Sequence, residues 1–138
     1  MIAELTLELR PQAHLVKLRY FGHYRIMKQE AAIDIFAALA QPTRISVFRL
    51  LVQVGPAGLP ALEIARRLNV VASTLSGHLS ILKRSGILTA TRHQREIHYA
   101  ANLSAVNELI AFLLSDCCGG QVSNCGDILS LLALEESP

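Results

Sequence analysis

The chain has 138 residues, a hydrophobic content of 51% and a formal net charge of +2. This length fits one domain with a single core, and this composition excludes a disordered chain. No apolar run reaches the ~18 residues of a membrane span, and the first four residues lack the charged and apolar regions of a signal peptide. We therefore expect a compact protein of the reducing cytoplasm with no membrane partner.

The basic residues are concentrated in the middle of the chain. Between residues 44 and 95 there are eight basic side chains and a single acidic one, Glu63. The eight are Arg44, Arg49, Arg66, Arg67, Lys83, Arg84, Arg92 and Arg95. Such a local excess favours a polyanionic partner such as DNA, although a solvated basic surface explains the charge alone equally well.

The first 26 residues are the least informative part of the sequence. Alternating leucines from Leu5 to Leu9 indicate a short strand, and a similar pattern from Val16 to Tyr20 indicates a second. Met27 stands immediately before the first strongly helical segment. We predict that Met27 is the functional start and that residues 1–26 are a dispensable extension.

Three helical segments are predicted next. Apolar residues at helical spacing indicate helices over residues 30–40 and 44–54, with Pro42 between them. A third helix, over residues 60–68, begins with Pro60, where a missing backbone donor costs least. One side of the first helix carries Ile33, Phe36, Ala37 and Ala40. The second helix is expected to face inward with Ile45, Phe48, Leu51 and Val52. The third is expected to face inward with Leu62, Ile64, Ala65 and Leu68.

A fourth predicted helix follows after a tight turn. Ser73 and Thr74 cap or open this helix, which stops at Gly86. Its buried side is expected to carry Leu75, Leu79 and Leu82. Two short helices around a tight turn are typical of a helix-turn-helix.

The pattern then changes from helical to alternating, which predicts a β-hairpin with strands near residues 87–91 and 96–99. The connection over residues 92–95 lacks Asn-Gly or Asp-Gly, so we expect a loop longer than two residues. A last long helix is predicted over residues 103–115 and a short one from Asp127 to Leu134. The long helix carries Val106, Ile110 and Leu113 on one face.

Two segments of the chain resemble a known family. The segment from Val71 to Leu88 (Val-Ala-Ser-Thr-Leu-Ser-Gly-His-Leu-Ser-Ile-Leu-Lys-Arg-Ser-Gly-Ile-Leu) resembles the recognition-helix signature of ArsR-type metal-responsive repressors. The segment from Ala38 to Arg44 (Ala-Leu-Ala-Gln-Pro-Thr-Arg) resembles the motif that precedes it there. The resemblance runs from about residue 31 to residue 125. It implies a mainly α, dimeric winged helix-turn-helix protein that represses transcription by binding operator DNA and is not an enzyme.

The predicted fourth helix has side chains suited to a DNA groove. Small and polar residues allow close approach to the major groove. Basic residues at the hairpin tip can reach phosphates or the minor groove, and an ordinary solvated turn is the other interpretation of these residues. For His78, packing within the protein or binding to a local carbonyl is an equally weighted interpretation. The predicted DNA-binding residues are Ser73, Thr74, Ser76, Gly77, His78, Ser80, Lys83, Arg84, Arg92 and Arg95.

A single module of this kind reads only a few base pairs, so affinity usually comes from a twofold dimer. Relatives in the resembled family dimerise through the helices that correspond to residues 30–40 and 103–115. Intramolecular packing is the other interpretation of these two apolar stripes. With the resemblance, we predict a homodimer.

The only cysteines are Cys117, Cys118 and Cys125. Soft thiolates select soft and borderline metals. Three thiols suit neither a structural zinc site, which is usually closed by four ligands, nor a disulfide, which leaves one thiol over. A trigonal metalloid ion, As(III) or Sb(III), would use all three.

The segment Cys117-Cys118-Gly119-Gly120 also resembles the arsenite-sensing branch of the family. Many relatives instead carry a Cys-x-Cys pair in the helix before the recognition helix, and residues 62–67 contain no cysteine. Gly119 and Gly120 allow the chain to turn so that Cys125 approaches the pair. We therefore predict that the three thiolates of one subunit bind one As(III) or Sb(III) as the inducer.

Three alternatives remain at this point. The cysteines could serve a redox-responsive or other soft-metal-responsive repressor, or they could be unrelated loop cysteines. A thiol enzyme is the weakest alternative, because no histidine is near a cysteine in sequence and the helix-turn-helix would be unexplained. The predicted organisation is an extension (1–26), a DNA-binding and dimerisation domain (27–115) and a metalloid-sensing tail (116–138).

Overall fold

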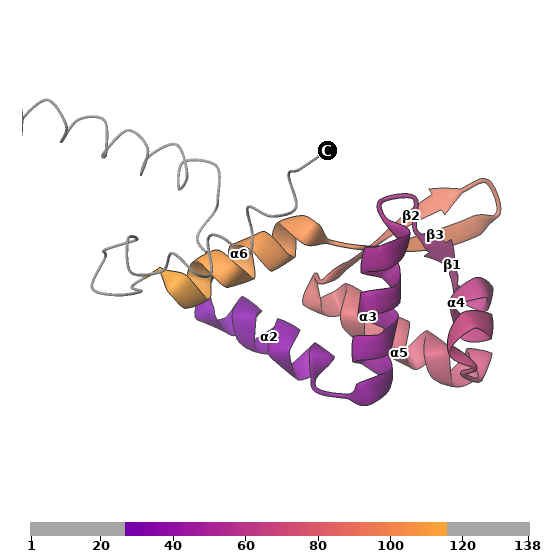
Figure 1. Cartoon of the computed structure of the whole chain (residues 1–138), viewed down its shortest axis with the longest axis horizontal. Helices are drawn as coiled ribbons and strands as arrows, with labels where there is room; N and C mark the ends of the chain where they lie inside the picture. The colour runs from indigo at the N-terminus through magenta and orange to yellow at the C-terminus, as the bar shows by residue number, and fades with distance from the viewer. Residues whose placement is uncertain (1–26, 116–138) are drawn as a thin grey trace, which may run out of the picture.

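The computed structural model describes residues 27–115. Figure 1 shows α2 and α6 at one end of this region and α4 and the hairpin at the other. In chain order the elements are α2 (Gln29–Leu39), α3 (Pro42–Val54), β1 (Leu59–Pro60), α4 (Ala61–Leu68), α5 (Ala72–Ser85), β2 (Leu88–His93), β3 (Glu96–Ala101) and α6 (Leu103–Leu114). The predicted mainly α fold with a β-hairpin wing is confirmed. The strands predicted before Met27 and the helix predicted from Asp127 lie outside the described residues.

The core lies between α2, α3, α4 and α5. Its innermost side chains come from all four helices and from the start of the wing, and each is less than 2% exposed. They include Ile35, Val47, Leu51, Ile64, Leu75, Leu79, Leu82 and Ile87. α2 packs mainly against α5, and α6 packs against α2. The stripe predicted for the fourth helix is therefore confirmed as core.

α2 and α3 meet at a corner that the sequence specifies locally. Gln41 precedes α3 and its Oε1 accepts a hydrogen bond from the backbone N–H of Arg44 at 2.9 Å. Pro42 then occupies the first helical position, where its missing N–H costs nothing. Within residues 27–115 no single helix is long and apolar enough to cross a membrane, and only the pair α2 and α3, bent by 102°, meets that criterion together by length and composition.

A three-stranded antiparallel sheet with the order β1-β3-β2 forms the wing. β2 and β3 pair from Leu88 opposite Ala101 to His93 opposite Glu96. Gly58 allows β1 to approach β3, because its φ is +67° and an added Cβ would lie 2.8 Å from the carbonyl carbon of Tyr99. A residue with a side chain would push these two strands apart.

The hairpin connection is shorter than predicted. His93 pairs with Glu96, so only Gln94 and Arg95 join the strands. Gln94 adopts a φ of 55°, which is usually left to glycine or asparagine. The prediction of a longer loop was wrong because it assumed that a two-residue turn needs Asn-Gly or Asp-Gly, whereas here Gln94 adopts the required positive φ.

Three side chains predicted to face inward are exposed. Ile45 and Val52 on α3 are 44% and 42% exposed, and Leu62 on α4 is 74% exposed. α3 carries apolar residues around much of its circumference, and the side with Val47 and Leu51 faces the core. α4 has eight residues and buries its Ile64–Ala65 side, which leaves Leu62 facing outward.

Candidate nucleic-acid interface

The turn between α4 and α5 is closed by backbone hydrogen bonds. α4 ends at Asn69, which has a left-handed conformation with a φ of 52°. The N–H of the next residue, Val70, donates to the carbonyl of Ala65 at 3.0 Å. Asparagine tolerates this conformation better than most residues, so the chain reverses within a few residues. α4 therefore packs directly on α5 as a helix-turn-helix.

α5 has one buried side and one free side. Leu75, Leu79 and Leu82 are buried in the core. Since successive residues on a helix lie about 100° apart, Gly77 and Arg84 fall on the side opposite this stripe. The exposed side of α5 is therefore small in the middle and basic at its C-terminal end.

The structure places eight of the ten predicted DNA-binding residues on α5 and two on the wing. All are exposed except His78, which is half-buried. The eight are Ser73, Thr74, Ser76, Gly77, His78, Ser80, Lys83 and Arg84. Ser73 and Thr74 lie in the first turn rather than at the cap, because Val71 precedes the helix.

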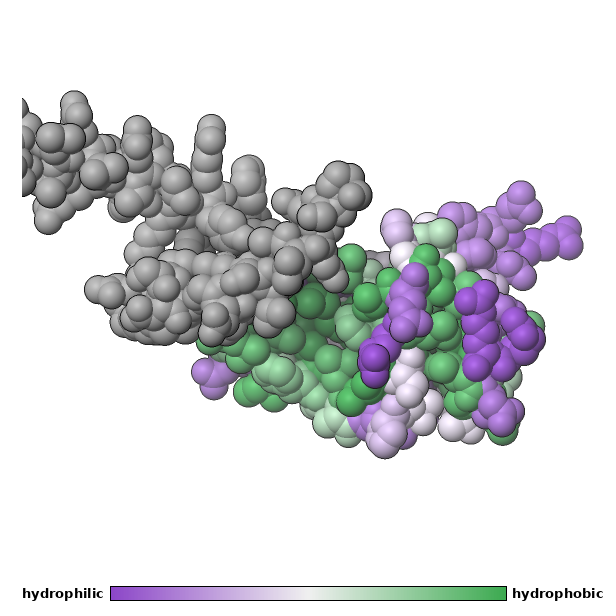
Figure 2. Space-filling view, viewed as in Figure 1, coloured by the Kyte–Doolittle hydropathy of each residue, from purple (hydrophilic) through white to green (hydrophobic). Residues whose placement is uncertain are grey.

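The two wing residues lie at the end of the hairpin. Arg92 is in β2 and its Nε donates to the carbonyl of Gln94 at 3.3 Å, while Arg95 is in the turn. Figure 2 shows hydrophilic residues gathered over this tip and over α4, at the same end of the molecule. The polar surface thus extends beyond the residues predicted from the sequence.

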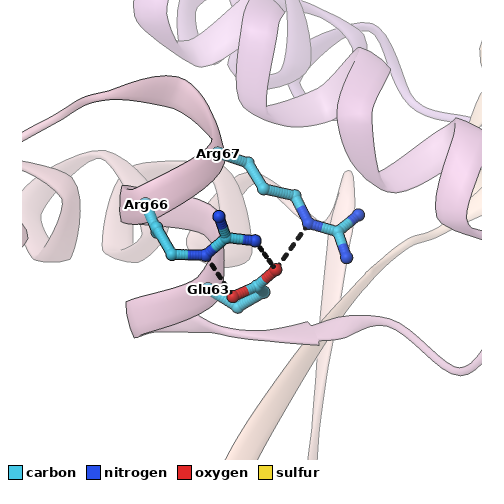
Figure 3. A network of polar contacts seen from close by, with 3 residues as sticks. All are labelled: Glu63, Arg66 and Arg67. Atoms are coloured by element: carbon cyan, nitrogen blue, oxygen red, sulfur yellow. Dashed lines mark hydrogen bonds and ion pairs between the residues drawn. The ribbon is translucent and has the colours of Figure 1, made fainter.

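On α4, Glu63 binds two arginines one turn further along the helix (Figure 3). Arg66 donates to its carboxylate from Nε at 2.9 Å and from Nη2 at 2.6 Å, and Arg67 donates from Nε at 2.7 Å. The hydrogen bonds from Arg66 and then Arg67 lower the pKa of Glu63 from 4.5 to about 2. The same pairing raises the pKa of Arg66.

This group of three side chains carries one net positive charge, from one carboxylate and two guanidiniums. Arg66 donates to Glu63 from both Nε and Nη2, whereas the terminal nitrogens of Arg67 point away from the carboxylate (Figure 3). The sequence prediction counted these arginines as basic charge but missed their pairing. The spacing of three and four residues after Glu63 is the signal that could have found it.

Arg44 also escaped prediction as a site residue. Its Nε donates to the carbonyl of Ala38 and its Nη2 to that of Ala37 at 3.5 Å, at the C-terminal end of α2. Its Nη1 lies 3.5 Å from Nδ1 of His78 on α5. His78 therefore makes a contact within the protein, which was one of the two interpretations of this residue from the sequence.

The wing also brings two histidines together. The rings of His93 and His98 have centroids 4.6 Å apart. His98 Nε2 lies 3.5 Å from Glu96, and its Nδ1 lies 3.4 Å from the carbonyl of Ala57. Within the described part of the chain, no group of three or more His, Cys, Asp or Glu side chains is arranged to hold a metal ion. The predicted ligands Cys117, Cys118 and Cys125 lie outside the described residues.

Known proteins share this helix-turn-helix. A family model described as a helix-turn-helix domain matches residues 39–91. An uncharacterised HTH-type transcriptional regulator of Methanocaldococcus jannaschii is 34% identical over 83 residues, which cover 60% of this chain and 91% of that protein. The solved ArsR-like transcriptional regulator from Rhodococcus sp. RHA1 is 25% identical, with a TM-score of 0.55 over 78% of this chain and 94% of its own. The chain belongs to the HTH-type transcriptional regulators.

The fold is also that of the homodimeric winged helix-turn-helix DNA-binding domain Mb0332 from Mycobacterium bovis. That domain is 21% identical, with a TM-score of 0.50 over 63% of this chain and 81% of its own. As an HTH-type transcriptional regulator, the protein binds DNA and regulates transcription. The comparisons thus support the general function, and they leave the inducer and the individual contact residues to be proposed.

Proposed function

We propose that this regulator is a homodimeric repressor that leaves its operator when As(III) or Sb(III) binds to Cys117, Cys118 and Cys125. One observation supports the sensing proposal above the others. The three cysteines follow α6 directly in sequence, and Cys117 comes three residues after its last residue, Leu114. A ligand at these thiols is therefore adjacent in sequence to an apolar helix suited to an interface.

The proposed homodimer interface consists of α2 and α6. On α2, Ala32, Ile35 and Ala38 make the core contacts, and the opposite side is open. Figure 2 shows hydrophobic residues gathered over α2 on the visible face. The most exposed large apolar side chains of the two helices are Ile33 at 54%, Phe36 at 45%, Leu103 at 53% and Leu113 at 56%. Covering such side chains with a second copy would remove them from water.

In the proposed complex, α5 enters the major groove with its open side, and the wing tip contacts the neighbouring backbone. Gly77 and the serines of α5 keep the helix surface close to the bases, while Lys83 and Arg84 at its C-terminal end bind phosphates. A dimer presents two such helices, so that two half-sites add their contacts. The contact set is the ten residues named above.

The proposed inducer site rests on the chemistry of its donors. Thiolates are soft ligands, and three of them satisfy a trigonal As(III) or Sb(III). The histidines of the wing suit harder borderline ions and are not part of this proposal. Since ligand binding requires deprotonated thiols, metalloid binding releases protons and should weaken as pH falls.

The proposed mechanism is one of linkage. A metalloid lowers DNA affinity only if it binds more tightly to a conformation of the dimer that fits DNA badly. α6 packs on α2, and α2 packs on α5. A change at the end of α6 can therefore alter the spacing of the two recognition helices through the interface.

A redox- or other soft-metal-responsive repressor is the second candidate. It uses the same DNA-binding domain, and it is favoured by two adjacent thiols followed by a third within eight residues of Cys117. Oxidation would join two of the thiols and leave one over. This candidate predicts release by peroxide and tolerance of the loss of one cysteine.

Both candidates are tested by titrating reduced protein onto a labelled duplex from its own upstream region and following fluorescence anisotropy. Arsenite is added to one series, and zinc or peroxide to the others. Release by arsenite alone supports the proposal. Release by peroxide or zinc, with no response to arsenite, supports the second candidate.

Single serine variants of Cys117, Cys118 and Cys125 sharpen the test. Each should bind the duplex like the wild type and lose release by arsenite, because two thiolates leave the trigonal ion one donor short. Ser123→Ala is a matched control, since it changes a neighbouring side chain without removing a thiol. Normal release from each cysteine variant would refute the three-thiolate site.

A further inference from the structure

Arg44 joins three helices through one guanidinium. It lies on α3, its Nε and Nη2 donate to the last carbonyls of α2, at Ala38 and Ala37, and its Nη1 approaches His78 on α5. The last carbonyls of a helix have no partner within the helix. α2 has no basic residue in its own last turn, so Arg44 supplies donors from the next helix.

The two carbonyls fix the orientation of the guanidinium. This group is planar and carries donors on all three nitrogens in a rigid arrangement. With Nε and Nη2 engaged at the end of α2, the third nitrogen has a set direction, and it lies 3.5 Å from Nδ1 of His78. The position of α2 therefore determines where Nη1 of Arg44 lies relative to the imidazole of His78 on α5.

The contact between Arg44 and His78 is favourable in only one protonation state of the imidazole. A guanidinium has no acceptor, so Nδ1 must offer a lone pair, which places the proton of the neutral ring on Nε2. A protonated ring would put two cations at this distance. With Arg44 at Nδ1, His78 keeps Nε2–H as a hydrogen-bond donor, and the half-buried ring belongs to the helix that carries the proposed DNA contacts.

We propose that Arg44 is a positioning residue for DNA binding, which orients His78 so that its Nε2–H donates to the nucleic acid. It also ties the end of the proposed dimerisation helix α2 to α5. This inference rests on the proposed placement of α5 against DNA, and it is independent of which inducer the protein senses. Acceptors that fit this donor are phosphate oxygens and the N7 and O6 atoms of guanine.

A double-mutant cycle tests the inference on the full chain without any inducer. Arg44→Gln, His78→Ala and the double variant are titrated onto the upstream duplex and onto an unrelated duplex of equal length. Each single variant should lose about five- to tenfold in affinity for the upstream duplex, as expected for one hydrogen bond. The double variant should lose no more than either single one, because both remove the same contact.

Arg49→Gln is the matched control for charge. Arg49 is exposed on α3, so this variant removes the same charge from the same helix. Its effect should be equal on both duplexes, and the loss caused by Arg44→Gln should exceed it on the upstream duplex. Losses that multiply in the double variant would overturn the inference. An unchanged affinity of His78→Ala would overturn it together with the placement of His78 on DNA.

Two further measurements distinguish a loss of His78 orientation from a general loosening of the corner between α2 and α3 in the Arg44→Gln variant. His78→Asn keeps an acceptor for Arg44 in Oδ1 and a donor in Nδ2, so it should retain most of the affinity when Arg44 is present and little in the Arg44→Gln background. A long-range proton–nitrogen NMR spectrum of the neutral ring should show the Nε2–H tautomer in the free protein. A ring protonated on Nδ1, or an asparagine as poor as alanine in both backgrounds, would contradict the inference.

Discussion

Replacing Gly77 by alanine separates the stability of the recognition helix from its contact with DNA. Gly77 is in the interior of α5 and on the side opposite the core stripe. Apart from the neighbouring residues and the backbone of α5 itself, no heavy atom lies within 4 Å of the Cβ that alanine would add, and the φ of Gly77 is outside the range that favours glycine. The methyl group therefore meets no obstacle in the free protein.

The two expected effects have opposite signs. Glycine in a helix interior is about 0.8–1.0 kcal/mol less favourable than alanine. Gly77→Ala should therefore stabilise the free protein by about that amount, which corresponds to a rise in Tm of about 4–8 °C for a domain of 60–100 residues. On DNA, the same methyl group would hold α5 away from the bases and weaken one or two hydrogen bonds of about 1 kcal/mol each. Affinity for the upstream duplex should fall by roughly five- to thirtyfold.

Thermal unfolding at one fixed protein concentration measures the first effect, and anisotropy titration measures the second. Gly86→Ala is the contrasting control, because that site is equally open but has a φ of +89°. Alanine is strained there, so this variant should lose stability. A stabilised Gly77→Ala protein with unchanged affinity for the upstream duplex would refute the placement of this side of α5 in the groove.

Three further predictions concern the rest of the fold. Gly58→Ala should destabilise the protein by ~1–3 kcal/mol in urea unfolding, because its backbone is left-handed and its Cβ would meet the Tyr99 carbonyl; unchanged stability would contradict the close approach of β1 to β3. The Glu63 carboxyl should titrate at about 2 by NMR, and since this lies below its ordinary pKa of 4.5, its stabilising effect should be complete above 4.5 and be lost as pH falls through about 2. A midpoint near 4.5 would show that the two arginines do not hold the carboxylate in solution. Phe36→Ser should shift the protein toward monomer in sedimentation, because Phe36 is 45% exposed on α2; an unchanged dimer would place the interface elsewhere.

The sequence was sufficient for α5, because several local signals agree there. Leu75, Leu79 and Leu82 have the spacing of one helix face, and Gly86 provides the left-handed residue that ends it, with a φ of +89°. The wing turn had no such agreement. Gln94 adopts a positive φ without being glycine or asparagine, so pairing of the two strands overrides the local preference of the turn.

Which apolar face is buried could not be decided from periodicity alone. α2 has two such faces, Ala32 and Ile35 on one side and Ile33 and Phe36 on the other. Spacing identifies both as helical, and packing against α5 selects the first. The contact between Arg44 and His78 could not be predicted from the sequence either, because the two residues are 34 positions apart.

The packing order of the helices limits how an inducer at the cysteines could act. α6 contacts α2 and α2 contacts α5, so a change at the end of α6 reaches the recognition helix through α2. Coupling is reciprocal, and a hundredfold loss of DNA affinity requires that the metalloid bind the DNA-free conformation about a hundredfold more tightly than the DNA-bound one. Because Arg44 joins the end of α2 to α5, a shift of α2 would also change the surroundings of His78. An inducer bound as proposed would therefore lower affinity in two ways: it would move the two recognition helices of the proposed dimer apart, and it would disturb the proposed His78 donor on each of them.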